Sequence, residues 1–358
     1  MTRESAIVVG GCGFIGIHCV LRLLRENYKV TCIDNLTRGT AVANLRWIKE
    51  KGNSPGPGLR FVNVDIRHFD DLRAALTSHS KTYGAPEVIF HQAAQVAVTQ
   101  SVIEPRNDFE INAHGTFNVL EAIRTVCPET TLIFSSTNKV YGGLKSIPTR
   151  ELSKRYEFES LSNGVPVTQP LDFYSPYGCS KGAADQYVRD YARIFNLRTI
   201  VFRQSCIYGT RQFGQEDQGW VCWFVIAALL KKRITVYGNG KQVRDLLWID
   251  DLIEAYWKAW QGSTTGGEVF NMGGGPGNTL SLLELLEILR ELEPSLAQPD
   301  FADWRPGDQP IYVSDIRDVC ERLHWKPKWT PQEGVNNLWR WVKGNRAEIQ
   351  AVTDDRQL

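Results

Sequence analysis

The sequence lacks most of the features that mark disulfide-stapled, metal-binding, membrane-spanning or nucleic-acid-binding proteins. Its eight cysteines are scattered without a C-x-x-C pair, and its six histidines show no metal-ligand spacing, so we expect reduced thiols and no metal. The longest apolar run, residues 221–230, is half of the roughly 20 residues that a membrane span needs. The N-terminus carries no signal-peptide core, which predicts a cytoplasmic protein without a membrane partner.

Charge of one sign is also missing, because 41 basic residues face 40 acidic ones and the net charge is +1. This balance predicts no nucleic-acid partner, although a local anion site stays possible. What is present is 358 residues with 42% hydrophobic and 23% charged side chains. That length and composition predict a globular enzyme with two domains, or one large α/β unit with a cap.

Short apolar segments alternate with segments of helical periodicity along the first 205 residues. We expect strands at residues 6–9, 29–33, 60–64, 88–91, 131–135 and 198–203, and helices between them at 14–26, 70–79, 107–126 and 176–195. Buried strands separated by amphipathic helices predict a Rossmann-like, doubly wound parallel sheet.

After residue 208 the pattern changes, and the sequence predicts a smaller C-terminal α/β cap. We expect cap helices at 221–231, 250–261, 281–291 and 333–343, and short strands near 235–237 and 269–272. The boundaries we expect are residues 1–205 with about 236–260 for the Rossmann domain, 206–235 and 261–350 for the cap, and 351–358 for a flexible tail.

Gly10, Gly13 and Gly16 lie between the first strand and the first helix. Glycines here allow a tight turn and close backbone approach to a pyrophosphate, and the helix N-terminus favours its negative charge. Asp34 ends the second strand, where its carboxylate can accept the ribose hydroxyls and repel a 2′-phosphate, so NAD is favoured over NADP. Arg38 lies close enough to weaken that preference. The alternative is a plain turn with a solvated aspartate.

Asp65 and Ile66 end the third strand and could hold the adenine, although a strand-end cap explains them equally well. The residues that we expect to bind the cofactor are Gly10, Gly13, Phe14, Ile15, Gly16, Asp34, Asn35, Arg38, Asp65, Ile66, Ala93, Tyr177 and Lys181.

Tyr177 and Lys181 are four residues apart on one expected helix, so they share a face. A phenol with a pKa near 10 is a poor base at neutral pH. A lysine ammonium and a nicotinamide cation nearby would favour the phenolate, which could then take a proton from a sugar hydroxyl. Thr137, at the end of a strand, is our choice for the third hydroxyl. A Tyr-x-x-x-Lys pair alone is common on ordinary helices.

Taken together, these motifs resemble the extended short-chain dehydrogenase/reductase family, and within it the nucleotide-sugar epimerases and dehydratases. The segments that carry the resemblance are the glycine loop, His91-Gln-Ala-Ala94, Ser136-Thr137 with Tyr141-Gly142, and Tyr177-x-x-x-Lys181. The resemblance covers residues 5–345. It implies a tightly bound NAD that is regenerated each turnover, a catalytic triad of Thr137, Tyr177 and Lys181, and a homodimer or homotetramer built on the helices at 107–126 and 176–195.

The two residues after Thr137 bear on the reaction type. The family's 4,6-dehydratases carry Asp-Glu there as acid and base, whereas this chain has Asn138 and Lys139, which disfavours elimination. These two residues, the segments 203–209, 211–214 and 216–220, and Cys206 in place of a frequent asparagine resemble the 2-epimerases of CDP-linked hexoses such as CDP-paratose and CDP-tyvelose.

The resemblance therefore implies NAD-dependent epimerisation at C2 of a CDP-sugar substrate, through a 2-keto sugar that is reduced again from the opposite face. It also implies a nucleoside-diphosphate site at Arg244, Arg305 and Asp308, and we expect Ser136, Asn138 and Trp220 to contact the substrate as well. The alternatives are a 4-epimerase of UDP-hexoses, another epimerase or 4,6-dehydratase of this family, and a non-catalytic NAD-binding regulatory protein.

Overall fold

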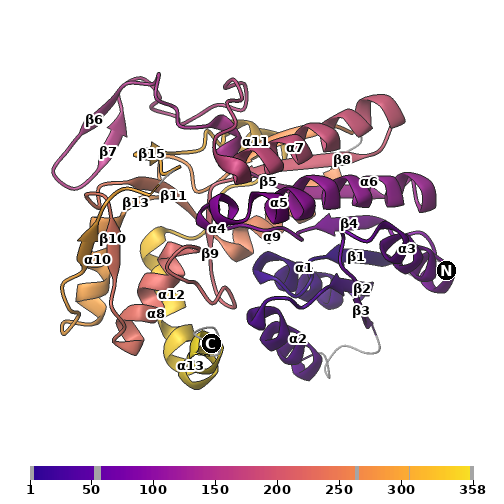
Figure 1. Cartoon of the computed structure of the whole chain (residues 1–358), viewed down its shortest axis with the longest axis horizontal. Helices are drawn as coiled ribbons and strands as arrows, with labels where there is room; N and C mark the ends of the chain where they lie inside the picture. The colour runs from indigo at the N-terminus through magenta and orange to yellow at the C-terminus, as the bar shows by residue number, and fades with distance from the viewer. Residues whose placement is uncertain (1–3, 52–57, 263–265, 306, 355–358) are drawn as a thin grey trace.

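The computed structural model describes residues 4–51, 58–262, 266–305 and 307–354 (Figure 1). Seven strands form one sheet in the order β12-β8-β5-β4-β1-β2-β3, and every neighbouring pair in it is parallel. The strands are β1 (Ser5–Val9), β2 (Lys29–Asp34), β3 (Leu59–Asn63), β4 (Val88–His91), β5 (Thr131–Thr137), β8 (Thr199–Gln204) and β12 (Glu268–Met272). The predicted doubly wound parallel sheet is confirmed.

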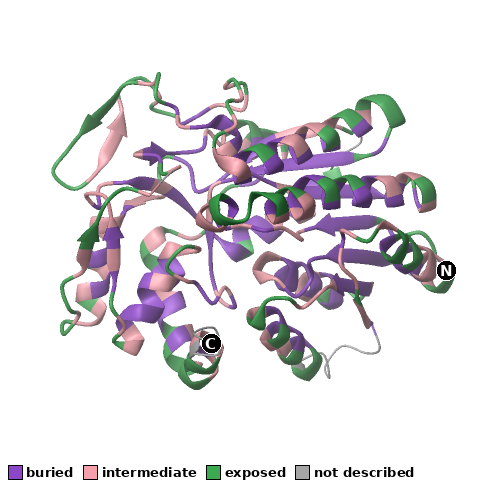
Figure 2. Cartoon of the chain, viewed as in Figure 1, coloured by how far each residue is buried: buried purple, intermediate pink, exposed green. Residues whose placement is uncertain are grey.

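Both faces of this sheet are covered by helices, which explains why its strands are apolar throughout rather than alternating. In β1, Ala6 and Val8 pack into one core cluster, while Ile7 and Val9 pack into the other. The first cluster includes residues of α1 (Phe14–Arg25), α2 (Gly39–Lys51) and α9 (Ile249–Gly262). The second includes residues of α3 (Phe69–Tyr83), α6 (Gly115–Val126) and α7 (Ser175–Phe195). Figure 2 shows the central strands between these two layers as buried, whereas β3 at one edge is largely of intermediate burial.

The strand order reverses direction between β1 and β4, since β2 and β3 lie on one side of β1 and β4, β5, β8 and β12 on the other. In open α/β sheets, ligands bind beyond the carboxyl ends of the strands at such a reversal. The glycine loop follows β1 and Thr137 ends β5, so both predicted halves of the site come to this edge.

The smaller region holds two further sheets and three long helices. Strand β11 (Val243–Trp248) pairs with β9 (Cys206–Tyr208), β13 (Thr279–Ser281) and β15 (Ile311–Tyr312). Strand β10 (Thr235–Tyr237) pairs with β14 (Asp300–Ala302). The helices are α8 (Trp220–Leu230), α10 (Leu282–Leu292) and α12 (Pro331–Gly344). The short helix α11 (Arg317–Arg322) precedes α12 in the chain, and α13 (Arg346–Asp354) follows it.

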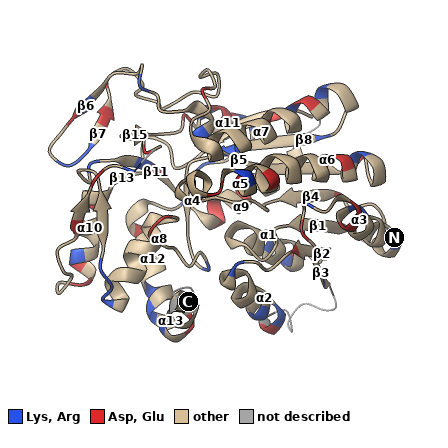
Figure 3. Cartoon of the chain, viewed as in Figure 1, with Lys and Arg blue, Asp and Glu red and all other residues tan. Residues whose placement is uncertain are grey.

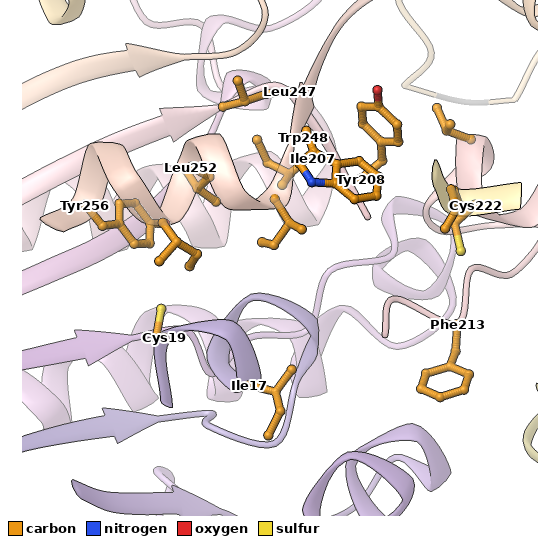
Figure 4. Packing of buried hydrophobic residues seen from close by; sticks show 14 of the residues in the cluster. Ile17, Cys19, Ile207, Tyr208, Phe213, Cys222, Leu247, Trp248, Leu252 and Tyr256 are labelled. Atoms are coloured by element: carbon orange, nitrogen blue, oxygen red, sulfur yellow. The ribbon is translucent and has the colours of Figure 1, made fainter. Parts of the chain in front are cut away.

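One continuous apolar core joins the smaller region to the seven-stranded sheet. Figure 4 shows Ile17 of α1 and Leu252 of α9 in the same cluster as Tyr208, Trp248 and Cys222 from β9, β11 and α8. Trp248 is 1% exposed. Because packed cores resist continuous deformation, the residues of the smaller region are held in a fixed position relative to the carboxyl edge of the sheet.

The structure corrects the predicted place of one strand. The strand expected near 269–272 as part of the cap is β12, which pairs along its whole length with β8 and forms the edge of the seven-stranded sheet. Its short length and its distance along the chain from the other strands gave no sign of this pairing. Residues 235–237 form the expected strand, but β10 pairs with β14 and not with the large sheet.

The helix expected over residues 107–126 is three consecutive pieces. These are α5 (Pro105–Phe109), a π-helical turn η1 (Glu110–His114) and α6. A π turn adds one residue to the helical repeat, which the 3.6-residue pattern does not reveal. Its consequence is local: the amide of buried Asn112 donates to Ser180 Oγ (3.1 Å) on α7.

Four other segments differ from or add to the prediction. Residues 39–51 form α2 and residues 98–103 form α4 (Val98–Ile103), neither of which was predicted. The long excursion expected over 143–175 contains the antiparallel pair β6 (Thr149–Glu151) and β7 (Tyr156–Phe158). Residues 351–354, expected in a flexible tail, belong to α13, and residues 355–358 lie outside the described residues.

Charged residues of both signs are interspersed over the helices and loops (Figure 3), in keeping with the near-zero net charge. Within the described parts of the chain, no helix is long and apolar enough to cross a membrane. Those same parts contain no group of three His, Cys, Asp or Glu side chains that could hold a metal ion.

Candidate active site

The loop after β1 is shaped by glycines that no other residue could replace. Gly10 has φ +77°, and a Cβ built on it would lie 2.3 Å from the backbone nitrogen of Ala93. A Cβ on Gly16 would lie 2.1 Å from the Gly10 carbonyl oxygen. The loop therefore packs against the backbone of the residues that follow β4.

Helix α1 begins at Phe14 without a capping side chain and without an acidic residue in its first turn. The first N–H groups of a helix have no partner within the helix, so those of Phe14, Ile15 and Gly16 are available to an anion. The bare backbone of the loop and this uncapped helix end fit the pyrophosphate of a dinucleotide.

Asp34 lies at the end of β2 and points toward the same loop. Its carboxylate accepts the backbone N–H of Cys12 (Oδ2, 3.0 Å) and of Leu36 (Oδ1, 2.9 Å), and each oxygen keeps a further acceptor site. Burial raises the pKa of Asp34, while the two N–H groups and the nearby Arg38 act in the opposite direction. The group can therefore accept from ribose hydroxyls. Arg38 itself is exposed, and its Nη1 lies 3.5 Å from Gln218 Oε1.

Asp65 is already engaged by the protein. The Arg67 guanidinium donates two hydrogen bonds to it (3.0 and 2.8 Å), the Arg67 backbone N–H a third (2.9 Å), and the Asn35 amide a fourth (2.9 Å). The hydrogen bonds from Arg67 hold the pKa of Asp65 well below its usual range. Ile66, next to it, is buried. These residues and Ala93 lie at the ends of β3 and β4, where we expected them, with Asp65 as part of a strand-end cluster.

Thr137, Tyr177 and Lys181 come together across β5 and α7. The Thr137 side chain is close enough to Tyr177 to act on its pKa, and Tyr177 and Lys181 are 9% and 3% exposed. Burial raises the pKa of Tyr177 to about 12, against the smaller opposing effects of Thr137 and Arg38. In the free protein the phenol is therefore protonated at neutral pH, and a further positive charge is needed to form the phenolate.

Lys181 is the buried cation of this group. Its Nζ lies 4.3 Å from the centre of the Phe134 ring. Burial lowers the pKa of Lys181 to about 7, while the Asp185 and Asp108 carboxylates oppose this effect. The ammonium is thus close to giving up its proton, and a neighbouring ligand could readily change its charge.

Two buried networks support these three residues, and the sequence analysis identified neither. Asp108 accepts from Ser180 Oγ, Gln95 Nε2 (2.9 Å) and Asn112 Nδ2 (3.1 Å). The π turn that places Asn112 leaves no pattern in the sequence, whereas Ser180, between Tyr177 and Lys181, could have suggested a partner there.

The second network includes a residue that we predicted to contact substrate. Ser136 Oγ donates to Asp185 Oδ2 (2.7 Å), and Asp185 forms a buried ion pair with Arg203 (2.9 Å). Tyr141 accepts from Arg203 (3.1 Å) and donates to Asn271 (2.6 Å). The Ser136 hydroxyl therefore links β5 to α7, because it donates its hydrogen bond to the Asp185 carboxylate.

The predicted substrate residues fall into two groups. Buried Asn138, partly buried Arg244 and exposed Asp308 lie around Lys139: Arg244 and Asp308 both interact electrostatically with its ammonium, and they interact with each other. In the other group, Arg305 stacks on Tyr237, with Cζ 3.5 Å from the ring centre, and donates to the Glu216 carbonyl (3.0 Å). Trp220 begins α8, and its side chain is close enough to Cys206 to act on the pKa of that thiol. Lys139 and Tyr237 were not predicted as site residues.

The chain combines a dinucleotide-type loop, a buried Tyr-Lys pair and an arginine-bearing second sheet, and comparison with known proteins identifies its family. The family model described as GDP-mannose 4,6 dehydratase matches residues 7–338. The chain belongs to the extended short-chain dehydrogenase/reductase family of nucleotide-sugar epimerases and dehydratases.

Relatives in this epimerase and dehydratase family carry more than one activity. The chain is 42% identical to the CDP-paratose 2-epimerase of Salmonella typhi, over 94% of this chain and 98% of that one. It is 30% identical to the UDP-glucose 4-epimerase of Mycolicibacterium smegmatis, over 92% and 95%.

Solved structures of the family give the same fold. The UDP-glucose 4-epimerase of Thermotoga maritima with UDP-glucose matches with TM-score 0.81 and 28% identity, over 96% of this chain and 100% of that one. The Thermus thermophilus UDP-glucose 4-epimerase complex with NAD matches with TM-score 0.76 and 29% identity, over 95% and 99%.

Proposed function

We propose that this protein is an NAD-dependent epimerase that inverts C2 of a CDP-linked hexose of the CDP-paratose and CDP-tyvelose type. The observation that carries the proposal is the 42% identity to a CDP-paratose 2-epimerase across 94% of the chain. A second observation supports it: the residues after Thr137 are Asn138 and Lys139, so the acid and base that elimination of water requires are absent from that position.

The residues present fit NAD as the cofactor. Gly10 and Gly16 have no space for a side chain, the first turn of α1 is uncapped, and Asp34 has acceptor sites left for ribose hydroxyls. When bound, NAD supplies a hydride acceptor for oxidation of the sugar and a hydride donor for its re-reduction. Since the cofactor is restored in each turnover, we expect it to stay bound to the purified protein.

Tyr177 is the proton carrier in this mechanism. Its phenolate takes the proton of the C2 hydroxyl as the sugar is oxidised to the 2-keto form, and it returns a proton to that oxygen on reduction. Thr137, whose side chain is close enough to Tyr177 to lower its pKa, orients the same hydroxyl. Lys181 lies one helical turn from Tyr177 on α7 and provides positive charge that favours the phenolate.

Inversion requires the hexose to present its opposite face between oxidation and reduction. The nucleoside diphosphate therefore has to stay bound while the sugar turns. Arg244 and Asp308 provide a cation and a carboxylate near the Lys139 ammonium, and guanidinium groups suit diphosphates.

The test is to isolate the protein, release and quantify any bound nicotinamide nucleotide, and incubate the holoenzyme separately with CDP-paratose and CDP-tyvelose. We expect about one NAD per chain and, by proton NMR, interconversion of the two sugars at C2. A protein without nicotinamide that stays inactive after NAD is added would contradict the proposal.

A 4-epimerase of UDP-hexoses is the second candidate, favoured by the 30% identity to a UDP-glucose 4-epimerase and by the match to one with UDP-glucose. The same assay with UDP-glucose decides between them. Inversion at C4 of UDP-glucose, with none at C2 of the CDP-sugars, would replace the first proposal with this one.

We also propose that the chain is a homo-oligomer, with α6 and α7 forming a contact between copies. Large apolar side chains on these helices are exposed to solvent, among them Ile194 at 64% and Tyr187 at 48%. Phe109 of α5 is exposed as well and lines a cavity of about 470 Å³ beside Arg106 and His114. Exposed apolar surface of this extent marks an interaction site. Light scattering on the Ile194→Glu variant should show a smaller particle than the unchanged protein.

A further inference from the structure

Lys139 is a half-buried cation that the mechanism above does not use. Its backbone N–H donates to Thr137 Oγ1 (3.3 Å), so the residue is joined directly to the proposed catalytic threonine. Its ammonium donates to the Gly307 carbonyl (3.1 Å) and to Gln309 Oε1 (3.2 Å). Both acceptors are neutral, and no ion pair within the described ranges includes Lys139. An ammonium has three N–H donors, so one is left for a ligand.

The electrostatics around Lys139 favour an anion. Burial, followed by the Arg244 guanidinium, lowers the pKa of Lys139 to about 7, and the Asp308 carboxylate opposes this effect. Lys139 and Arg244 thus share the Asp308 carboxylate, and the Asp245 carboxylate acts on Arg244 as well. Because both hydrogen-bond acceptors of the half-buried Lys139 ammonium are neutral, a phosphate between Lys139 and Arg244 would gain charge-assisted hydrogen bonds from both cations.

The segment that holds Lys139 is itself fixed to the catalytic strand. Gln309 is 1% exposed, accepts from Lys139 and donates to the Gly142 carbonyl. Lys139 and Gln309 therefore tie residues 307–309, which include Asp308, to the turn after β5. The ammonium is held at one position relative to Thr137 by this arrangement.

We propose that Lys139 binds the phosphate linked to the sugar and thereby places C2 of the hexose at Thr137 and Tyr177. This inference rests on the proposed function. In a nucleotide hexose the phosphate is attached to C1, C2 is the next carbon, and C4 lies across the ring. A phosphate held by the side chain two residues beyond Thr137 brings C2 to the catalytic hydroxyls, whereas C4 chemistry needs the phosphate farther away. Lys139 is thus a specificity-determining residue for the reacting carbon.

Calorimetric titration of the holoenzyme with CMP and with CDP tests the phosphate contact. Lys139→Met removes the charge while keeping much of the side-chain bulk, and Lys139→Arg keeps the charge. We expect the preference for CDP over CMP to fall about tenfold or more in Lys139→Met, as for a lost charged hydrogen bond, and to be largely retained in Lys139→Arg. Lys154, exposed and paired with Glu287 at 2.6 Å, gives the matched control Lys154→Met, whose preference should not change.

The inference would be overturned if Lys139→Met bound CMP and CDP more weakly by the same factor, or bound both as tightly as the wild-type enzyme does. If that variant does not fold, as judged by circular dichroism, Lys139→Gln provides the same comparison. If the wild-type enzyme inverts C2 of CDP-paratose but Lys139→Met keeps the wild-type preference for CDP over CMP, Lys139 does not have the inferred role and the proposed function stands. If the wild-type enzyme inverts no CDP-hexose at C2, the proposed function itself is wrong.

Discussion

The cofactor side of the site, around Gly10 and Asp34, consists mainly of backbone groups at the ends of buried strands. The substrate side, around Lys139 and Arg244, consists of long charged side chains on a turn, a second sheet and residues 307–309. The first is held by the core of the seven-stranded sheet. In the second, β11 belongs to the same core, while hydrogen bonds such as Lys139 to Gln309 fix the turn and residues 307–309. A rigid cofactor side suits a cofactor that stays bound, whereas a side-chain-built substrate side lets related enzymes differ in substrate on one fold.

The largest effect on turnover should come from the point where the two sides meet. Tyr177→Phe removes the proton carrier, so we expect kcat to fall by roughly 10³-fold or more, while the bound NAD stays at the level of the unchanged protein. The assay is NMR of the CDP-sugar, with nucleotide quantified after denaturation. Retention of activity within tenfold would show that another group carries the proton.

A substitution in the glycine loop on the cofactor side should disturb the structure of the loop itself. Gly10→Ala places a Cβ 2.3 Å from the Ala93 nitrogen at φ +77°, a conformation that costs alanine about 1–3 kcal/mol even without the clash. We expect loss of bound NAD and a lower melting temperature. Gly262→Ala is the control, since a Cβ there meets nothing within 4 Å. Equal NAD content in the two variants would mean that the loop adapts.

A smaller effect is expected from Lys181, on the way the free energy of unfolding changes with pH. Its pKa is lowered to about 7 in the folded protein, whereas in the unfolded chain it is near 10.4. Between these values the unfolded state binds more protons, so stability rises with pH. From pH 7 to pH 9, the free energy of unfolding of the cofactor-free protein should rise by roughly 1–3 kcal/mol more than that of Lys181→Met. Denaturant titrations at both pH values measure this difference, and equal rises would contradict it.

Ser136→Ala should have the smallest effect on activity. Its hydroxyl donates to buried Asp185, so its loss should lower stability by about 1–2 kcal/mol and leave KM for the CDP-sugar within about threefold. Steady-state kinetics combined with thermal melting separates the two roles. A large rise in KM with unchanged melting would restore Ser136 as a substrate contact.

The two sides also differ in how far the sequence predicted them. Gly10, Asp34 and the Tyr177–Lys181 pair were predictable because backbone clearance, strand ends and i, i+4 spacing leave local patterns. Lys139, Gln309 and Asp108 were not, because each acts through contacts between segments far apart in the chain. The place of β12 and the π turn at Glu110–His114 were missed for a related reason, since strand partners and one-residue insertions in a helix are set by tertiary packing.

The central claim is that hydrogen leaves C2 as hydride and returns to the same carbon. The most direct measurement is turnover of the CDP-sugar in deuterated water, followed by NMR of the product. The account predicts inversion at C2 with no deuterium bound to any carbon, because only the hydroxyl proton passes through Tyr177 to solvent. Deuterium at C2 of the product would show that the inversion goes through proton abstraction from carbon and would contradict the account.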